Sequence, residues 1–221
     1  MKLLVKKILE FLAFLFSHIY TFRLNKWLNE KTNYLYTSWI SNFLGMVGDN
    51  TRILRPLKLQ GGGQHRIRIG SDTFLEAHCV LGCWESYQES HYEPEIVIGN
   101  QCNIGEYCHI TAIDRITIGD GLLTGRFVYI GDNAHGGLSW EEANTPPAQR
   151  LLSSKGPIKI GRNVWIGDKV SIMGGITIGD NVIIGAGSIV THDVPSNSMA
   201  AGMPARVVKS LKDRNGVLEK Y

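Results

Sequence analysis

The sequence predicts an all-β solenoid: a parallel β-helix of about five or more coils, with N-terminal helices and a short C-terminal helix. Three observations support this: a glycine excess, a six-residue repeat of aliphatic residues, and Gly-Asp pairs at intervals. Glycine makes up 25 of the 221 residues, against a usual level of ~7%. Hydrophobic residues make up 43%, which is enough for a packed core and excludes a disordered chain.

The repeat is clearest near the C-terminal end, where an aliphatic residue recurs every six positions from Ile160 to Val190. The same spacing starts at Ile69, Ile98 and Ile118. A period of six matches neither a helix nor a simple strand, but it fits a short strand followed by a sharp turn. Three such units would close one coil, and coils would stack at the ~4.8 Å spacing of neighbouring strands. Small or branched inward residues follow four positions after each aliphatic: Val164, Val170, Ile176, Val182, Ser188 and Val194.

Interruptions of the repeat define the domain organisation. The helical segment covers 1–50, the β-helix covers 51–203 with loops at 85–95 and 136–157, and a helical cap covers 204–221. The Gly-Asp pairs suit the coil corners, where backbone angles are unusual. The predicted coils are 69–84, 98–115, 118–135, 160–177 and 178–195.

Two helices are expected before the solenoid. An uncharged apolar run at 11–22 is shorter than the ~18 residues needed to span a bilayer. The favoured interpretation is a helix packed on the protein or on a sister subunit, and the second is an interfacial helix that contacts a membrane through residues 1–26. The pattern of residues 24–44 predicts an amphipathic helix that ends near Gly45. A second helix is predicted at residues 206–214, where it would cover the C-terminal end of the solenoid.

Charge and cysteine content exclude several function classes. The net charge of +3 is too small to argue for nucleic acid. No cysteine pair has C-x-x-C spacing, and Cys79, Cys102 and Cys108 occupy inward positions of the repeat, so we expect them in the core. A reducing compartment, the cytoplasm, is therefore expected, with contact at the inner membrane as the alternative.

Several motifs resemble the hexapeptide-repeat (left-handed β-helix) acyltransferases: N-V-W-I-G at 163–167, G-A-G-S-I-V-T at 185–191 and A-G-M-P-A-R at 201–206. D-N-A-H-G at 132–136 and T-P-P-A-Q-R-L-L-S-S at 145–154 make the sequence most similar to sugar O-acetyltransferases of lipopolysaccharide O-antigen and exopolysaccharide assembly. The resemblance implies left-handed coils and a homotrimer with active sites between subunits. It also implies acetyl-CoA as co-substrate, a sugar as acceptor, and no metal.

His135 is the candidate general base, because imidazole titrates near neutral pH and this residue stands at the mouth of the 136–157 loop. The family places its catalytic histidine at the corresponding position. Asp132 or Asn133 could orient the ring, and Trp140 and Arg150 of the loop could contact the sugar. By resemblance, the residues near coenzyme A would be Trp165, Gly167, Gly185, Ala186, Thr191, Arg206 and Lys209.

Three other functions are weighed. An N-acetyltransferase of nucleotide-linked amino sugars would share the fold and the base. A γ-class carbonic anhydrase would need three histidines around a metal, but the repeat aligns His109 with Tyr129 and places it at a different corner from His135. A non-catalytic solenoid would need neither His135 nor the basic pair Arg206 and Lys209.

Overall fold

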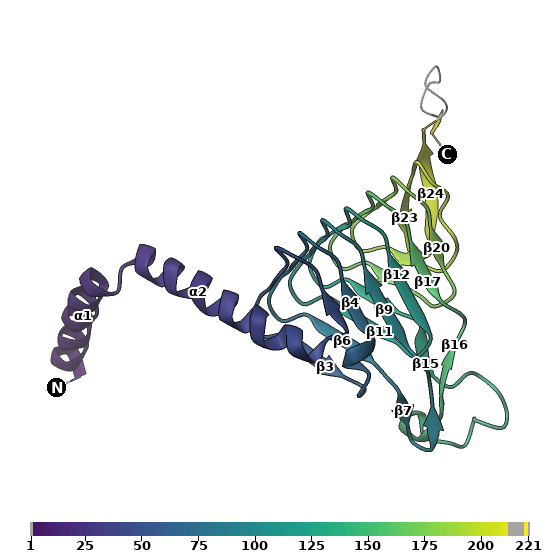
Figure 1. Cartoon of the computed structure of the whole chain (residues 1–221), viewed down its shortest axis with the longest axis horizontal. Helices are drawn as coiled ribbons and strands as arrows, with labels where there is room; N and C mark the ends of the chain where they lie inside the picture. Colours follow the sequence, from purple (N-terminus) through teal and green to yellow (C-terminus); the bar gives the residue numbers. More distant parts are fainter. Residues whose placement is uncertain (1, 212–218, 221) are drawn as a thin grey trace.

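The structure is a computed structural model that describes residues 2–211 and 219–220, and its centre is a parallel β-helix whose strands stack into three faces of a prism (Figure 1). The first face contains β1 (Met46–Val47), β4 (Ile67–Ile69), β9 (Glu95–Ile98), β12 (Arg115–Ile118), β17 (Ile158–Ile160) and β20 (Thr177–Ile178). The second face contains β2 (Arg52–Ile53), β5 (Phe74–Leu75), β10 (Asn103–Ile104), β13 (Leu123–Thr124), β18 (Trp165–Ile166) and β21 (Ile183–Ile184). The third face contains β3 (Lys58–Gln60), β6 (Val80–Cys83), β11 (His109–Ala112), β14 (Tyr129–Gly131), β19 (Ser171–Ile172) and β22 (Ile189–Val190).

The six-residue repeat fixes the register of these sheets. Ile98 pairs with Ile69 on one side and with Ile118 on the other, so equivalent aliphatic residues stack in columns inside the prism. The predicted inward residues are buried, including the small ones four positions later. Thr124 is a polar member of its column, and its hydroxyl accepts a hydrogen bond from the Gly105 N–H at 2.9 Å.

Aspartates of the Gly-Asp pairs hold successive coils together at the corners. The Asp120 carboxylate accepts from the backbone N–H of Asn100 at 2.7 Å, and Asp180 accepts from that of Arg162 at 2.7 Å. Each bond joins one coil to the next where the chain bends between faces. Side-chain hydrogen bonds therefore join successive coils at the corners, whereas backbone hydrogen bonds join them along the faces.

The coil boundaries differ from the predicted ones in two places. A coil formed by β1, β2 and β3 precedes the predicted start at residue 69. The strand before the long loop ends at Gly131, so His135 lies outside the coil in which the spacing placed it. The first loop contains β7 (Ser86–Tyr87) and β8 (Ser90–His91), and the second contains β15 (Asn133–His135), the short helix η3 (Pro147–Gln149) and β16 (Leu152–Ser154). We call the loops 84–94 and 132–157 the short and the long excursion.

The helices precede the prism: α1 (Lys2–Ile19), α2 (Phe22–Ile40) and η1 (Ser41–Phe43), with η2 (Gln64–Arg66) between coils. Thr21 caps α2, since its hydroxyl accepts from the Leu24 N–H. The C-terminal end of α2 covers the first coil through the buried residues Thr37 and Ile40. Across the described residues, none of the helices has the length and apolarity needed to cross a membrane.

Hydroxyl groups of α2 bond to the backbone of the first coil. The Thr37 hydroxyl accepts from the Ile53 N–H at 3.0 Å and lies 3.1 Å from the Ile53 carbonyl oxygen, to which it can donate. The Tyr36 hydroxyl accepts from the Leu57 N–H at 2.9 Å. These backbone groups have no preceding coil to pair with, so α2 supplies the partners that a coil would have supplied.

The predicted C-terminal helix is wrong over the described residues. Ala205–Ser210 form the strand β24, which pairs antiparallel with β23 (Ser198–Gly202) and extends the second face. Residues 212–214 of the predicted helix lie outside the described residues, and β25 (Glu219–Lys220) pairs with β24. The open sheet edge offers backbone partners to a short segment, whereas an isolated helix of that length is only marginally stable.

Candidate active site

His135 lies on β15, which runs antiparallel to β16 and carries the chain away from the third face. Its backbone is opposite Leu152, and its side chain is exposed. The imidazole ring packs edge-on against the ring of Tyr87, with centroids 5.2 Å apart. Figure 1 shows β7, β15 and β16 gathered at one corner of the prism. The histidine is therefore positioned by both excursions together.

Hydrogen bonds join the two excursions. The Tyr87 hydroxyl donates to the Ala148 carbonyl at 2.7 Å, and the Gln88 side chain donates to the same oxygen at 3.1 Å. The Tyr92 hydroxyl donates to the Leu152 carbonyl at 3.1 Å. Residues about 60 positions apart are thereby fixed beside His135.

A cleft of about 270 Å³ lies between the third face and the excursions, with His135 in its lining. Clefts beside α2 are larger, about 500 and 650 Å³, but no histidine or cysteine lines them among the described residues. A further cleft of about 400 Å³ is lined by His65 and lies away from both His135 and the long excursion. We place the chemistry in the smaller cleft because His135 lines it. Its lining residues are Gln60, Trp84, Tyr87, His109, Thr111, Tyr129, Asn133, His135 and Leu152.

His109 lines the same cleft as His135, which corrects the expectation that the two histidines lie at different corners. The predicted alignment of His109 with Tyr129 is confirmed, and their rings meet edge to face at 5.6 Å. Burial, with a smaller contribution from Lys58, lowers the pKa of His109. The ring is thus predominantly neutral at pH 7, and its buried Nε2 has no hydrogen-bond partner among the described residues.

Asp132 and Asn133 are close to His135 in sequence, but they bond elsewhere. The Asp132 carboxylate accepts from the N–H groups of Ile113 and Asp114 at 2.9 and 3.0 Å. The Asn133 amide donates to the Thr111 carbonyl at 3.1 Å. Burial raises the pKa of Asp132, although these N–H groups offset part of the effect. Both side chains fix the start of the long excursion, and within the described residues neither is hydrogen bonded to His135.

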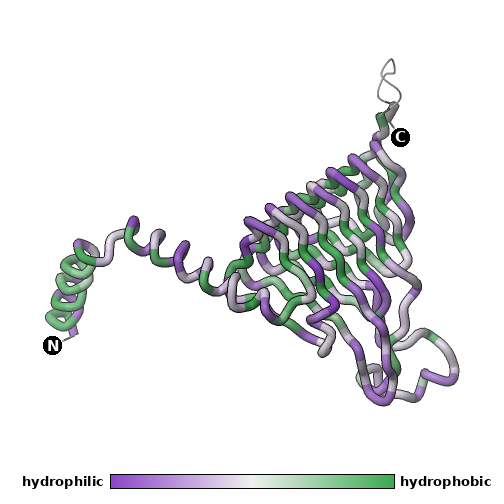
Figure 2. Tube along the Cα trace, viewed as in Figure 1, coloured by the Kyte–Doolittle hydropathy of each residue, from purple (hydrophilic) through white to green (hydrophobic). Residues whose placement is uncertain are grey.

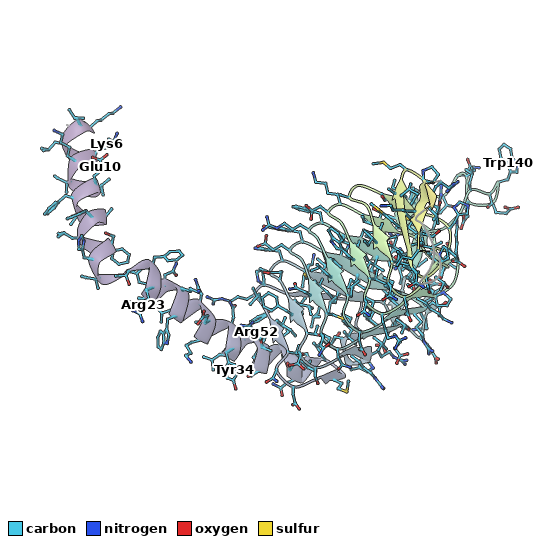
Figure 3. All side chains as sticks on the ribbon, turned by 90° about the horizontal axis from the view of Figure 1, so that it is seen from above. Lys6, Glu10, Arg23, Tyr34, Arg52 and Trp140 are labelled. Atoms are coloured by element: carbon cyan, nitrogen blue, oxygen red, sulfur yellow. The ribbon has the colours of Figure 1, made fainter. Side chains whose placement is uncertain are left out.

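The two residues predicted to contact the sugar lie on the long excursion and have different surroundings. Trp140 is 91% exposed and extends away from the prism (Figure 3). The Arg150 guanidinium donates to the carbonyls of Thr145 at 2.8 Å and Gly137 at 3.3 Å, so it braces the excursion internally. Neither residue lines the cleft that contains His135.

Some of the residues predicted to lie near coenzyme A are on a face of the prism, and others are at a corner. Trp165 points outward from the second face and is 52% exposed. Gly167 and Gly185 lie at the next corner, where a Cβ on Gly167 would come within 2.6 Å of the Ala186 nitrogen. Glycine at position 167 is therefore needed for coil stacking with or without a ligand.

The remaining predicted residues lie at the C-terminal end of the prism. His192 links Thr191 to Arg206: its Nδ1 is 2.9 Å from the Thr191 hydroxyl and 3.3 Å from the Arg206 guanidinium. Because Arg206 can only donate, Nδ1 acts as the acceptor. Lys209 is separate from this group and lines another cleft with Ile183 and Met199.

The cysteines are part of the core. Cys79, Cys83, Cys102 and Cys108 are all buried, and burial raises the pKa of Cys79 and Cys83 to about 12. A thiolate nucleophile is therefore disfavoured at neutral pH. In the described part of the chain, no three histidine, cysteine or acidic side chains are grouped to hold a metal ion.

Sequence reasoning missed Tyr87, Trp84 and His109 as members of the site. The loop at 85–95 is visible as a break in the repeat, but its partner is not. The signal that was available is the coil register, which places β6, β11 and β14 side by side on the third face. Side chains of that face therefore adjoin both loops that leave it.

The family model for the bacterial transferase hexapeptide (six repeats) matches residues 157–192. WbbJ of Escherichia coli K12, named for O-acetyl transfer in lipopolysaccharide biosynthesis, is 33% identical over 129 residues, which cover 57% of this chain. Galactoside O-acetyltransferase of the same organism is 42% identical over 114 residues, or 48% of this chain. The chain spans 65% and 51% of the length of these two curated relatives.

Solved structures agree on the fold. The hexapeptide-repeat acetyltransferase VCA0836 of Vibrio cholerae, complexed with acetyl coenzyme A, has a TM-score of 0.52 and 26% identity. That similarity covers 78% of this chain and 74% of the other. The N-acyltransferase AntD of Bacillus cereus, solved with dTDP and coenzyme A, has a TM-score of 0.63 at 20% identity, over 80% of this chain and 89% of its own.

Proposed function

The chain is a hexapeptide-repeat protein related to sugar O-acetyltransferases, and on this premise we propose that it transfers an acetyl group from acetyl-CoA to a sugar hydroxyl. One observation carries the proposal. His135, exposed and packed against Tyr87, stands in the lining of a cleft beside the matched repeats. Polysaccharide or lipopolysaccharide precursors are the acceptor class that the similarity to WbbJ favours.

The proposed mechanism is direct transfer. His135 removes the proton from the sugar hydroxyl as its oxygen attacks the thioester carbonyl carbon. The tetrahedral intermediate collapses, the carbon–sulfur bond breaks, and the protonated imidazole returns the proton to the coenzyme A thiolate. The histidine ends in its starting state, so the reaction needs no covalent acyl-enzyme. A hydrogen-bond donor to the oxyanion would complete the site.

The acceptor would occupy the cleft between the third face and the excursions. The rings of Tyr87, Trp84 and Tyr129 provide apolar surface for a sugar ring. His109, which is predominantly neutral, leaves Nε2 free of partners within the described residues, and Gln60 adds an amide. These groups line the same cleft as His135.

Coenzyme A would run along the corner formed by Gly167, Gly185 and Ala186, with Thr191 and Arg206 near its far end. The His192 imidazole contacts both the Thr191 hydroxyl and the Arg206 guanidinium, and so keeps Arg206 close to Thr191. We propose that a second subunit covers this groove in a homotrimer of left-handed β-helices. Outward residues of the second face form an apolar column suited to such a contact: Leu123, Trp165, Ile183 and Met199.

The test measures acetyl transfer from acetyl-CoA to a panel of sugars, nucleotide-linked sugars and their amino derivatives, with product analysis. His135→Ala should lower the turnover rate by about 10²–10⁴-fold, because the base is lost. His91→Ala is the matched control, since His91 is exposed on the short excursion and does not line the cleft.

Retained turnover in His135→Ala would contradict the assignment of the base. If only amino groups are acetylated, the chain is an N-acetyltransferase and not an O-acetyltransferase. Absence of any acetyl-CoA turnover in the wild type, with folding verified by circular dichroism, would contradict the proposed function as a whole.

A further inference from the structure

Helix α1 has no residue buried against the rest of the described chain. Figures 1 and 3 show it standing apart from the prism at the end of α2. Side chains such as Ile8, Leu12 and Phe16 are at least half exposed. The interpretation in which α1 packs on its own prism is therefore wrong, which leaves a surface that needs a partner.

The helix is amphipathic with a broad apolar face. At 100° per residue, one face contains Leu4, Val5, Ile8, Leu9, Phe11, Leu12, Leu15, Phe16 and Ile19. The opposite face contains Lys2, Lys6, Glu10, Ala13 and Ser17, and Lys6 pairs with Glu10 at 3.8 Å. Figure 2 shows α1 as mostly hydrophobic along its length, in contrast to the mixed colouring of α2. An apolar face of this width under a narrow polar strip is typical of a helix lying in a membrane interface.

The positive charge of the N-terminal segment indicates which kind of partner would bind the apolar face of α1. Residues 1–31 contain six basic side chains (Lys2, Lys6, Lys7, Arg23, Lys26 and Lys31) and two acidic ones (Glu10 and Glu30), giving +4, while the whole chain carries only +3. A second copy would bring like charges together, whereas an anionic surface would neutralise them. Because no described helix is able to span a bilayer, the chain would rest on the surface.

We propose that α1 binds the surface of an anionic lipid bilayer, with the Ile8 and Leu12 side of the helix in the headgroup–acyl boundary. Lys2 and Lys6 lie on the polar side, from which they reach lipid phosphates. Lys7 lies between Phe11 and Phe14, and its long side chain can extend to the same phosphates. Helix α2 then acts as the stalk between the membrane and the prism. Its 19 residues correspond to about 28 Å of helix.

The test is flotation of the full chain with vesicles of phosphatidylcholine containing phosphatidylglycerol, compared with vesicles of phosphatidylcholine alone. Each net positive charge near the anionic surface adds roughly fivefold to partitioning, so three lysines against Glu10 should favour the anionic vesicles by on the order of 25-fold. Added salt should reduce that preference. Ile8→Glu with Leu12→Glu should abolish flotation, because two charges would enter the apolar face.

Ala13→Glu with Ser17→Glu is the matched control: it adds the same two charges at the same spacing on the polar face. Both pairs of substitutions lose the same electrostatic attraction, so this control should bind anionic vesicles more weakly than the wild type but clearly more tightly than the apolar-face pair. A loss to the same extent as in the apolar-face pair would overturn the orientation we propose. No flotation of the wild type with either vesicle would overturn the proposal. If, in addition, Ile8→Glu with Leu12→Glu lowers the number of subunits in analytical ultracentrifugation, the partner is a second copy of the chain.

Discussion

The prism and the two excursions follow different rules. In the prism, the position of a residue within its six-residue unit decides whether its side chain is buried, as the column Ile69, Ile98 and Ile118 shows. In the excursions, a residue such as Tyr87 is placed by a partner about 60 positions away. A periodic framework thus provides stability from local repetition, while the chemistry is assembled from segments that interrupt the repetition.

The largest effect on stability should come from the prism. Ile98→Ala removes a fully buried side chain between two stacked isoleucines and should lower the unfolding free energy by about 2–5 kcal/mol. Chemical denaturation measures this loss. Turnover per folded molecule should be unchanged, because Ile98 lies on the first face, away from the cleft.

Val97→Ala is the control for this substitution, since Val97 points outward from the same strand and is only half-buried. It should cost clearly less stability than Ile98→Ala. Equal losses at the two positions would contradict the view that alternation alone decides burial along the strand.

Asp132→Asn tests the junction between prism and excursion. The amide retains one acceptor for the two N–H groups that the carboxylate binds, which costs about 1–3 kcal/mol in unfolding free energy. Above the folded-state pKa the amide also avoids burying a charge, which offsets part of that loss. The raised pKa of Asp132 determines whether the unfolding free energy rises or falls with pH. The native state holds the Asp132 proton more tightly than the unfolded chain, so this group's contribution to stability is full below pH 3.8 and declines as the pH rises through the folded-state pKa.

Denaturation at several pH values checks this sign. The stability difference between wild type and Asp132→Asn should shrink as the pH rises above 3.8. A difference that grows with pH would show that the N–H groups outweigh burial at this carboxylate.

The smallest effect should come from within the excursions. Tyr87→Phe keeps the ring against His135 but removes the hydroxyl that bonds to Ala148. The lost bond corresponds to about 0.5–1.5 kcal/mol, and it should appear as faster amide hydrogen exchange in the long excursion. The global unfolding midpoint should stay close to that of the wild type. A drop as large as that of Ile98→Ala would mean that the excursions and the prism unfold as one unit.

The sequence was sufficient for the prism because burial follows the period of six. It proposed His135 because this residue adjoins a break in that period, and the structure places His135 in the lining of a cleft. It was insufficient for His109 and Tyr87, since the partners of a loop are set by three-dimensional packing. The C-terminal segment was mistaken for a helix because its role in extending a sheet edge depends on β23 being there to pair with. Likewise, amphipathicity in 24–44 is real, but the exposed side contains Leu35 and Trp39, while Thr37 and Ile40 face the prism.

The hydroxyls of Tyr36 and Thr37 have a consequence for self-association. A stack of parallel strands ends in a row of free backbone groups, and such an edge can recruit strands of other molecules into fibrils. Thr37 and Tyr36 occupy the N–H groups of Ile53 and Leu57 on the first coil with side chains that cannot continue a ladder. The first coil therefore terminates the solenoid, and the growth of end-to-end polymers is blocked at the same two positions that attach the helix.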